Sequence, residues 1–321
     1  MSVKAWVSKL RIFLRETRRN RQILKSPKYQ KSRIEAEIIR NVHSIEKGLS
    51  LAAPRLGFGV AKIKELFTLC ETYLALKPET LECLCFARDA LAAYLDFHAA
   101  KNYVDENISA IKIAYEKLAS TLPRSENAEI FGGNETLAVS DMVFDAEQVE
   151  RLFNTRHSIR EFSGESVSDE DLEKAIKLAQ RCPSACNRQG VRIYSISGKT
   201  LVADMGKALE GIGGFANDVD KFLLVTGKKS AYRADEKNQF IVSAAIFCAY
   251  LSLTLHTFKI ASCIIQRPLR PNNSWDKICD KYKIPRDEQL VALIGVGRYK
   301  KETTVPVSKR YELKTIYRKL G

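Results

Sequence analysis

The sequence predicts a helical N-terminal half followed by a domain of the α/β or α+β class with a covered sheet. Three observations lead to this prediction. The chain has 321 residues, 45% of them apolar, which is enough for a sizeable core. Helical periodicity dominates the first 122 residues. From about residue 146, short β-branched runs alternate with helical segments, as in a sheet packed between helices.

The N-terminal region, residues 1–125, is predicted to be mostly helical. Pro78 and the stretch 100–103 break the periodicity into three successive helices. Ahead of them, glycines and a proline interrupt the helical pattern at 41–59. The expected helices span residues 60–77, 79–99 and 104–122.

Residues 126–145 contain Gly132 and Gly133 and lack strong periodicity, so they are predicted to form a linker. The second domain then spans residues 146–321. The β-branched runs predict its strands at 191–197, 221–226 and 289–296. Its expected helices lie at about 168–181, 199–210, 235–258 and 273–282.

The net charge of +14 is concentrated at the N-terminus, where residues 1–40 hold twelve Lys or Arg against three Glu, a net of +9. The main support for a nucleic-acid partner is therefore lost. Residues 3–17 form a basic amphipathic pattern. Such a helix either packs on its own protein, or residues 1–25 contact an anionic membrane surface or an acidic partner.

Polar residues interrupt the most apolar stretch, 241–258, so it resembles a buried helix more than a bilayer span. The N-terminus lacks the features of a secretory signal. Most of the eight cysteines lie in apolar segments, where a thiol behaves as a small hydrophobe. We therefore expect a cytoplasmic protein with unpaired thiols, or one that is peripheral at the inner face of the membrane.

Arg156, Ser158 and Arg160 form an R-x-S-x-R element directly after a predicted helix. In an extended segment, alternation places all three side chains on one side. Two guanidiniums and a hydroxyl directed at one place suit a phosphate dianion, because guanidinium offers paired donors and stays charged. The other interpretation is a solvated basic strand.

A second element, P-S-x-x-N-x-Q at 183–189, closes the helix that begins near Ser168. A Pro-Ser turn at a helix end leaves backbone N–H groups and a hydroxyl available to a ligand. Asn and Gln can fix a heterocycle or a neighbouring loop by hydrogen bonds. Taken alone, the element is also an ordinary polar turn.

These elements in this order resemble the N-terminal signature of the nitroreductase-like flavoproteins. R-x-S-x-R is followed by a helix opened by Ser-Asp-Glu, then P-S-x-x-N-x-Q and a strand. The resemblance continues in a long apolar helix that leads into a turn before Ser262-Cys263, and in a late strand with a glycine turn. A basic segment, PVSKRYELK at 306–314, resembles the family's C-terminal phosphate-contacting segment.

The resemblance implies an α+β fold, a nitroreductase-like mixed sheet covered by helices, and a homodimer with FMN at the subunit interface. It implies electron transfer from NADH or NADPH through FMN to a small-molecule acceptor by a ping-pong mechanism, and no catalytic side chain is identified. The FMN phosphate and ribityl chain would be held by the R-x-S-x-R element and the basic segment, and the isoalloxazine would lie against the Pro-Ser turn of the partner subunit. The cofactor-binding candidates are Arg156, His157, Ser158, Arg160, Pro183, Ser184, Ala185, Asn187, Lys309 and Arg310.

Two departures from the family pattern lie around the long helix. Phe258, Lys259 and Ile260 stand where the family usually has Gly-Leu-Gly, and Ser243 stands where an Asp is common. A second hypothesis is therefore a flavin-fold binding protein with reduced turnover or none, in a membrane-associated assembly. The elements HSIEKGLS and RLGFG resemble an extension of family members that occur alongside polysaccharide biosynthesis proteins.

Several rival motifs are excluded by context. G-x-G-x-x-A at 211–216 follows a predicted helix instead of a strand, which argues against a dinucleotide site. Cys182 and Cys186 lack the further pair that a zinc site needs, and His43 with Glu46 supplies only two ligands, so no metal site is expected. The sequence contains no G-x-S-x-G, H-E-x-x-H or Walker motif.

Overall fold

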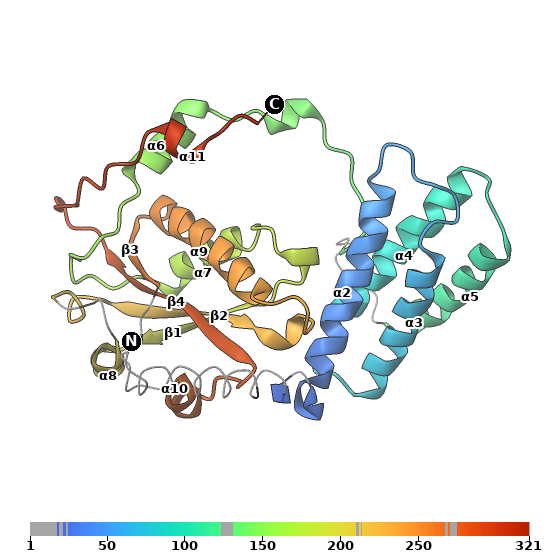
Figure 1. Cartoon of the computed structure of the whole chain (residues 1–321), viewed down its shortest axis with the longest axis horizontal. Coiled ribbons are helices and arrows are strands. Elements are labelled where there is room, and N and C mark those ends of the chain that lie inside the picture. The colour runs from blue at the N-terminus through green and yellow to red at the C-terminus, as the bar shows by residue number, and fades with distance from the viewer. Residues whose placement is uncertain are drawn as a thin grey trace.

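The fold is described from a computed structural model of the chain. The model describes residues 18, 22–23, 25–122, 131–209, 212, 214–266, 269 and 275–320. The amphipathic helix expected at 3–17 lies outside the described residues. Elements carry the labels of Figure 1, where the helical region and the sheet lie side by side.

The N-terminal region packs its helices around one apolar core, which includes Ile45, Leu66 and Leu91. Each helix contributes an apolar face at helical spacing. The three predicted helices are present, with ends shifted by a few residues. The region contains η1 (Pro27–Tyr29), α2 (Gln30–Leu49), α3 (Val60–Ala75), α4 (Glu82–Ala100) and α5 (Glu106–Thr121).

The interruption predicted at 41–59 begins after Leu49, where α2 ends, so the last turn of the helix still includes Gly48. A tertiary contact requires this glycine: a Cβ added at Gly48 would lie 2.1 Å from the Phe58 ring, so only glycine admits this ring. Tyr94 donates its hydroxyl to the Phe58 carbonyl at 2.8 Å, and Nε2 of His98 accepts the Gly57 N–H at 2.9 Å. HSIEKGLS and RLGFG therefore pack against each other, which gives both elements a structural role.

The second domain holds a four-stranded sheet in the order β1-β2-β4-β3. Its strands are β1 (Val191–Ser197), β2 (Lys221–Lys228), β3 (Ile260–Ile265) and β4 (Glu288–Arg298). Every neighbouring pair among these described strands is antiparallel, so the expectation of a mixed sheet is wrong for them. Strand β3 was not predicted, because a short strand that follows a long helix directly leaves no separate period in the sequence.

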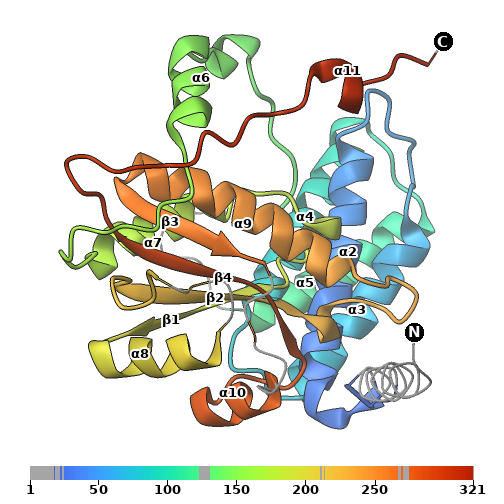
Figure 2. The ribbon, with the colours of Figure 1, turned by 60° about the vertical axis from the view of Figure 1, so that its left-hand side comes forward.

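Helices cover both faces of the sheet (Figures 1 and 2). Along β2 the side chains alternate: Phe222 and Leu224 pack in one core cluster, and Leu223 and Val225 pack in the other. A strand buried on both faces accounts for the uninterrupted apolar run in the sequence. Helices α8 (Lys199–Ala208) and α10 (Trp275–Tyr282) cover the first face, and α7 (Asp169–Ala179) and α9 (Gln239–Thr257) cover the second.

Helix α9 is the one helix in the described part of the chain that is long and apolar enough to cross a membrane. Nearly half of its apolar window is buried inside the protein. Leu251 and Leu255 pack fully against the sheet. The apolar side chains on the sheet-facing side of α9 therefore belong to the core of the domain.

Helix α2 links the two regions, because it contacts η3 (Ala185–Asn187) and η4 (Lys229–Ala231) of the second domain. Ala36 of α2 packs with Ala231 and Tyr232, which follow β2. A short segment at 131–133 lies on α4, where a Cβ at Gly132 would lie 2.6 Å from the Phe86 carbonyl oxygen. The boundaries at 125 and 146 stay a prediction. Exposed elements flank the sheet domain: η2 (Val139–Met142), α6 (Ala146–Thr155) and α11 (Leu313–Ile316).

Candidate functional site

The R-x-S-x-R element lies between α6 and the sheet, and its backbone is anchored at both ends. The Arg156 N–H donates to the Leu152 carbonyl at 3.2 Å and ends α6. The Ile159 N–H donates to the carbonyl of Ser262 on β3 at 2.9 Å. Ile159 is buried and Arg160 is exposed. The segment is therefore held in a defined place beside β3, with its arginine side chains unburied.

Arg156 and Arg160 both lie near Cys263 of β3. Burial raises the pKa of the Cys263 thiol, and the positive charges of Arg160 and Arg156 oppose that rise. Arg160 donates only a long hydrogen bond of 3.4 Å to the Ser158 carbonyl. In the described ranges, neither arginine is ion-paired with a carboxylate. Two guanidiniums beside a half-buried serine therefore retain donor capacity for an anion.

Hydrogen bonds close the Pro-Ser turn on itself and on α9. The Gln189 N–H donates to Ser184 Oγ at 3.0 Å, and the Asn187 N–H donates to the Ser184 carbonyl at 2.9 Å. The Ala185 N–H points to Oγ of Ser243 at 3.5 Å. Ser243, the position of one family departure, thus contacts the turn. Pro183 and Asn187 are exposed, and Ser184 and Ala185 are half-buried.

Arg188 holds this turn in place, although no motif in the sequence marks it as functional. Its side chain is almost fully buried and makes two hydrogen bonds to the Glu236 carboxylate, at 2.7 and 2.6 Å. It donates to the Ala185 carbonyl at 2.9 Å and lies 4.4 Å from the Tyr232 ring centroid. The hydrogen bond from Arg188 lowers the pKa of Glu236. No local pattern signals this pair, because 48 residues separate the partners.

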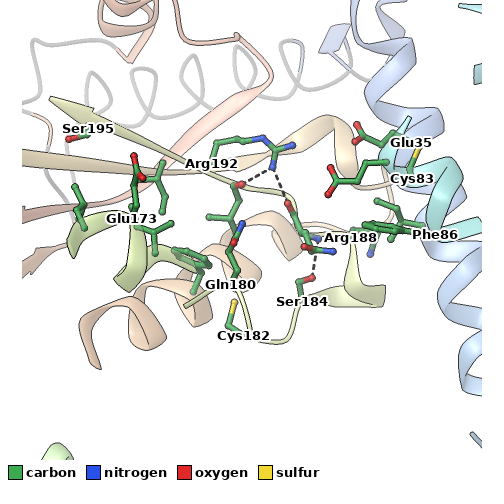
Figure 3. A pocket seen from close by; sticks show the side chains of 18 of the residues that line it. Glu35, Cys83, Phe86, Glu173, Gln180, Cys182, Ser184, Arg188, Arg192 and Ser195 are labelled. Carbon is green, nitrogen blue, oxygen red and sulfur yellow. Dashed lines mark hydrogen bonds between the residues drawn. The ribbon is translucent and has the colours of Figure 1, made fainter. Parts of the chain in front are cut away.

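A cavity of about 700 Å³ adjoins the turn (Figure 3). Its volume is in the range of small-molecule sites. The turn contributes Ser184 and Arg188, and the helical region contributes Glu35 and Phe86 from the opposite side. Arg192 of β1 lies at this cavity and donates to the Gln189 carbonyl at 3.0 Å. The cavity mixes apolar and charged walls and includes neither Arg156 nor Arg160.

A single chain does not bring the two candidate elements together. The turn contacts Ser243 near the start of α9, whereas Thr155, which precedes Arg156, contacts His256 near its end. Thirteen residues of helix separate these contacts by about 20 Å. Within one chain the structure groups Arg156, Ser158 and Arg160, and separately Pro183, Ser184, Ala185 and Asn187.

The remaining candidates lie apart from the turn. His157 is half-buried near His256, and its charge contributes to the lowered pKa of that histidine. Lys309 and Arg310 are exposed on the C-terminal segment, and Arg310 hydrogen-bonds the carbonyl of its neighbour Ser308. The segment follows β4 along the outside of the domain (Figure 2).

The cysteines are not cross-linked to one another, and the two candidate metal ligands, His43 and Glu46, make local contacts. All eight cysteines are described, and none forms a disulfide, as expected for them. His43 Nδ1 lies 3.8 Å from Glu46, and Glu46 also accepts the Gly133 N–H at 3.3 Å. Within the described residues, no group of three or more His, Cys, Asp or Glu is placed to hold a metal ion.

The segment that contains the R-x-S-x-R element and the Pro-Ser turn is similar to known proteins. Residues 154–213 match the model of the Nitroreductase family, which confirms the resemblance over this segment. A protein of Archaeoglobus fulgidus named as an NADH dehydrogenase/NAD(P)H nitroreductase is 36% identical over 62 residues. That match covers 19% of this chain and 36% of the relative, so the chain spans about a third of its length.

Solved structures named as nitroreductases are also similar. An FMN-dependent nitroreductase from Clostridium difficile has 22% identity and a TM-score of 0.46, and covers 53% of this chain and 98% of its own. A nitroreductase from Desulfovibrio desulfuricans in complex with FMN has 18% identity and a TM-score of 0.47. This second match covers 56% of this chain and 99% of its own.

Proposed function

We propose that the chain is an FMN-dependent oxidoreductase that passes electrons from NADH or NADPH to a small-molecule acceptor. The observation that carries the proposal is the pair Arg156 and Arg160, held beside β3 without a carboxylate partner among the described residues. An unpaired guanidinium pair in a backbone-anchored segment is suited to a phosphate. The family match over residues 154–213 supports this phosphate being that of FMN.

The residues present fit such a cofactor. Arg156, Ser158 and Arg160 would hold the phosphate and the start of the ribityl chain, because anchoring at Leu152 and Ser262 fixes where they lie. When bound, FMN would supply the redox chemistry by taking electrons from NAD(P)H and passing them to the acceptor in a separate half-reaction. The protein binds and orients, so no nucleophilic side chain is required.

The Pro-Ser turn would complete the site from a partner subunit. Its distance from Arg156 in one chain supports this arrangement, since α9 separates the two elements. A homodimer is further supported by apolar side chains left exposed near α6, on the outer face of α9 and in the C-terminal segment. They include Val143, Phe144, Phe153, Ile241, Val242, Tyr250, Val307, Tyr311 and Ile316. In such a dimer, Lys309 and Arg310 would complete the phosphate site.

Absorbance of the purified protein tests the proposal. The expected result is a visible flavin band that NADH or NADPH bleaches without oxygen and that air or another acceptor restores. A double variant, Arg156→Ala with Arg160→Ala, should lack the band, while Arg151→Ala on the exposed face of α6 should keep it. A colourless parent protein that gains no band when FMN is added would contradict the proposal.

A second candidate is a flavin-fold binding protein with little or no turnover, in a membrane-associated polysaccharide assembly. The turn after α9 favours it: within the segment that stands in place of the family's Gly-Leu-Gly, Lys259 adopts the left-handed conformation at φ 56°. Retention of the flavin band without bleaching by NADH or NADPH would support this candidate over the first.

Membrane association is proposed for residues 1–25, which lie mostly outside the described residues. Each basic residue near an anionic surface contributes about 1 kcal/mol, an attraction that salt weakens. Flotation with anionic liposomes should therefore carry the full chain and leave a chain without residues 1–25 behind. Equal flotation of both proteins would make this helix an internal packing element.

A further inference from the structure

His256, in the last turn of α9, joins three elements by two side-chain hydrogen bonds. One ring nitrogen, Nε2, lies 2.8 Å from the hydroxyl of Thr155, the last residue of α6. The other, Nδ1, lies 2.8 Å from the hydroxyl of Tyr299, directly after β4. Thr155 is also the residue before Arg156. The contact therefore connects α9 and the end of β4 to the start of the R-x-S-x-R element.

The direction of these bonds follows from the number of hydroxyl protons. Thr155 lies 2.7 Å from the Arg151 carbonyl, which can only accept, so Thr155 donates its single proton there. Its oxygen must then accept from Nε2–H of His256. In a neutral imidazole Nδ1 is then the acceptor, and it receives the hydroxyl proton of Tyr299. One neutral tautomer of His256 satisfies all three bonds.

The electrostatic surroundings also favour the neutral ring. Burial lowers the pKa of His256 below its ordinary value, and Arg156 and His157 lower it further. From the β4 side the ring meets the Tyr299 hydroxyl, whose own pKa burial raises. A protonated ring would stand beside Arg156 and would need Tyr299 to turn its proton away. The connection thus depends on an uncharged histidine.

We propose that His256 is a positioning residue that holds the R-x-S-x-R segment, through Thr155, in the geometry that binds a phosphate. Two anchors bracket the segment: the Thr155 side chain is tied to α9, and the Ile159 N–H is tied to Ser262 on β3. Between them, Arg156 has its backbone fixed while its side chain stays unpaired within the described chain. The identification of the phosphate as that of FMN rests on the proposed function. The positioning of the segment by His256 and Thr155 does not.

Two threonines of similar local setting make a matched test. Thr155→Val removes the hydroxyl with little change of shape, and Thr155→Ser keeps it. Thr257→Val is the control, because the Thr257 hydroxyl is exposed and bonds only the Leu253 carbonyl of its own helix at 3.0 Å. Thr155→Val and His256→Ala should each weaken FMN binding about three- to tenfold. Thr155→Ser and Thr257→Val should bind FMN as the parent does.

Riboflavin and hydrogen exchange separate positioning from general loosening. Riboflavin lacks the phosphate, so its affinity should be unchanged in Thr155→Val. Without any flavin, amides 156–160 should exchange faster in Thr155→Val and His256→Ala than in the parent and Thr155→Ser. Unchanged exchange and FMN affinity, or equal losses for FMN and riboflavin, would overturn the inference. A parent that binds no FMN would refute the proposed cofactor. Hydrogen exchange of amides 156–160 would then be the test of whether His256 positions the segment.

Discussion

Arg188 and the pair Arg156 and Arg160 belong to two elements of one family-matched segment, yet the protein uses them differently. Arg188 is 4% exposed and bound to the Glu236 carboxylate, a carbonyl and an aromatic ring. Arg156 and Arg160 keep unburied guanidiniums without a carboxylate partner in the described chain. A buried, paired guanidinium maintains structure, whereas an anchored but unpaired one is available to a ligand.

The largest expected effect is on folding stability, from Arg188→Ala. The change leaves the partly solvated Glu236 carboxylate and the Ala185 carbonyl without their donor, so the free energy of unfolding should fall by roughly 3 kcal/mol. Urea unfolding measures this. Arg192→Ala is the matched control: Arg192 is exposed, adjoins the same turn and donates to backbone carbonyls, so its loss should cost under about 1 kcal/mol. Similar costs for both variants would refute the structural role of Arg188.

Acidification sharpens this part of the comparison. The hydrogen bond from Arg188 lowers the pKa of Glu236 in the folded chain, relative to the ordinary value of 4.5 expected when unfolded. The stabilisation by the pair is therefore present above about pH 4.5 and is lost as the pH falls through the lowered folded pKa. In Glu236→Gln this component of the pH dependence should be absent. Parent and variant curves of unfolding free energy that stay parallel between pH 6 and acid unfolding would contradict it.

The next effect concerns ligand affinity. Arg156→Ala and Arg160→Ala should each weaken FMN binding by roughly 1.5–3 kcal/mol, about tenfold to over a hundredfold, while stability changes little. Lysine should restore binding only in part, because an ammonium does not reproduce the guanidinium fork. Riboflavin should bind the parent poorly and be indifferent to both changes. Titration calorimetry of the flavin-free protein decides this, and unchanged FMN affinity in both variants would remove the site assignment.

The smallest effect tests the departure from the family pattern after α9. Lys259 has a left-handed backbone at φ 56°, which strains any residue with a Cβ. Lys259→Gly should raise the free energy of unfolding by about 0.5–1 kcal/mol, since relief of strain outweighs the greater chain entropy of glycine. Lys259→Ala, which keeps the Cβ, serves as the control in thermal unfolding. A gain in Lys259→Ala equal to that in Lys259→Gly would assign the effect to the side chain.

Local pattern was sufficient for most of the secondary structure. Helical spacing predicted α3, α4 and α5 to within a few residues, and the β-branched runs predicted β1, β2 and β4. It was less exact where a tertiary contact sets a boundary. The interruption predicted at 41–59 begins only after Leu49, and Gly48 lies in the last turn of α2, where the absence of a Cβ leaves room for the Phe58 ring.

The sequence by itself determined which residue types are present for phosphate binding and in what order, because R-x-S-x-R and P-S-x-x-N-x-Q are local patterns. Only the tertiary structure decided which arginine is committed to folding. Glu236 reaches Arg188 across 48 residues, and His256 reaches Thr155 across 101. Side-chain chemistry is the same in all three arginines, so the division between structure and binding depends on which partners the fold brings within hydrogen-bond distance.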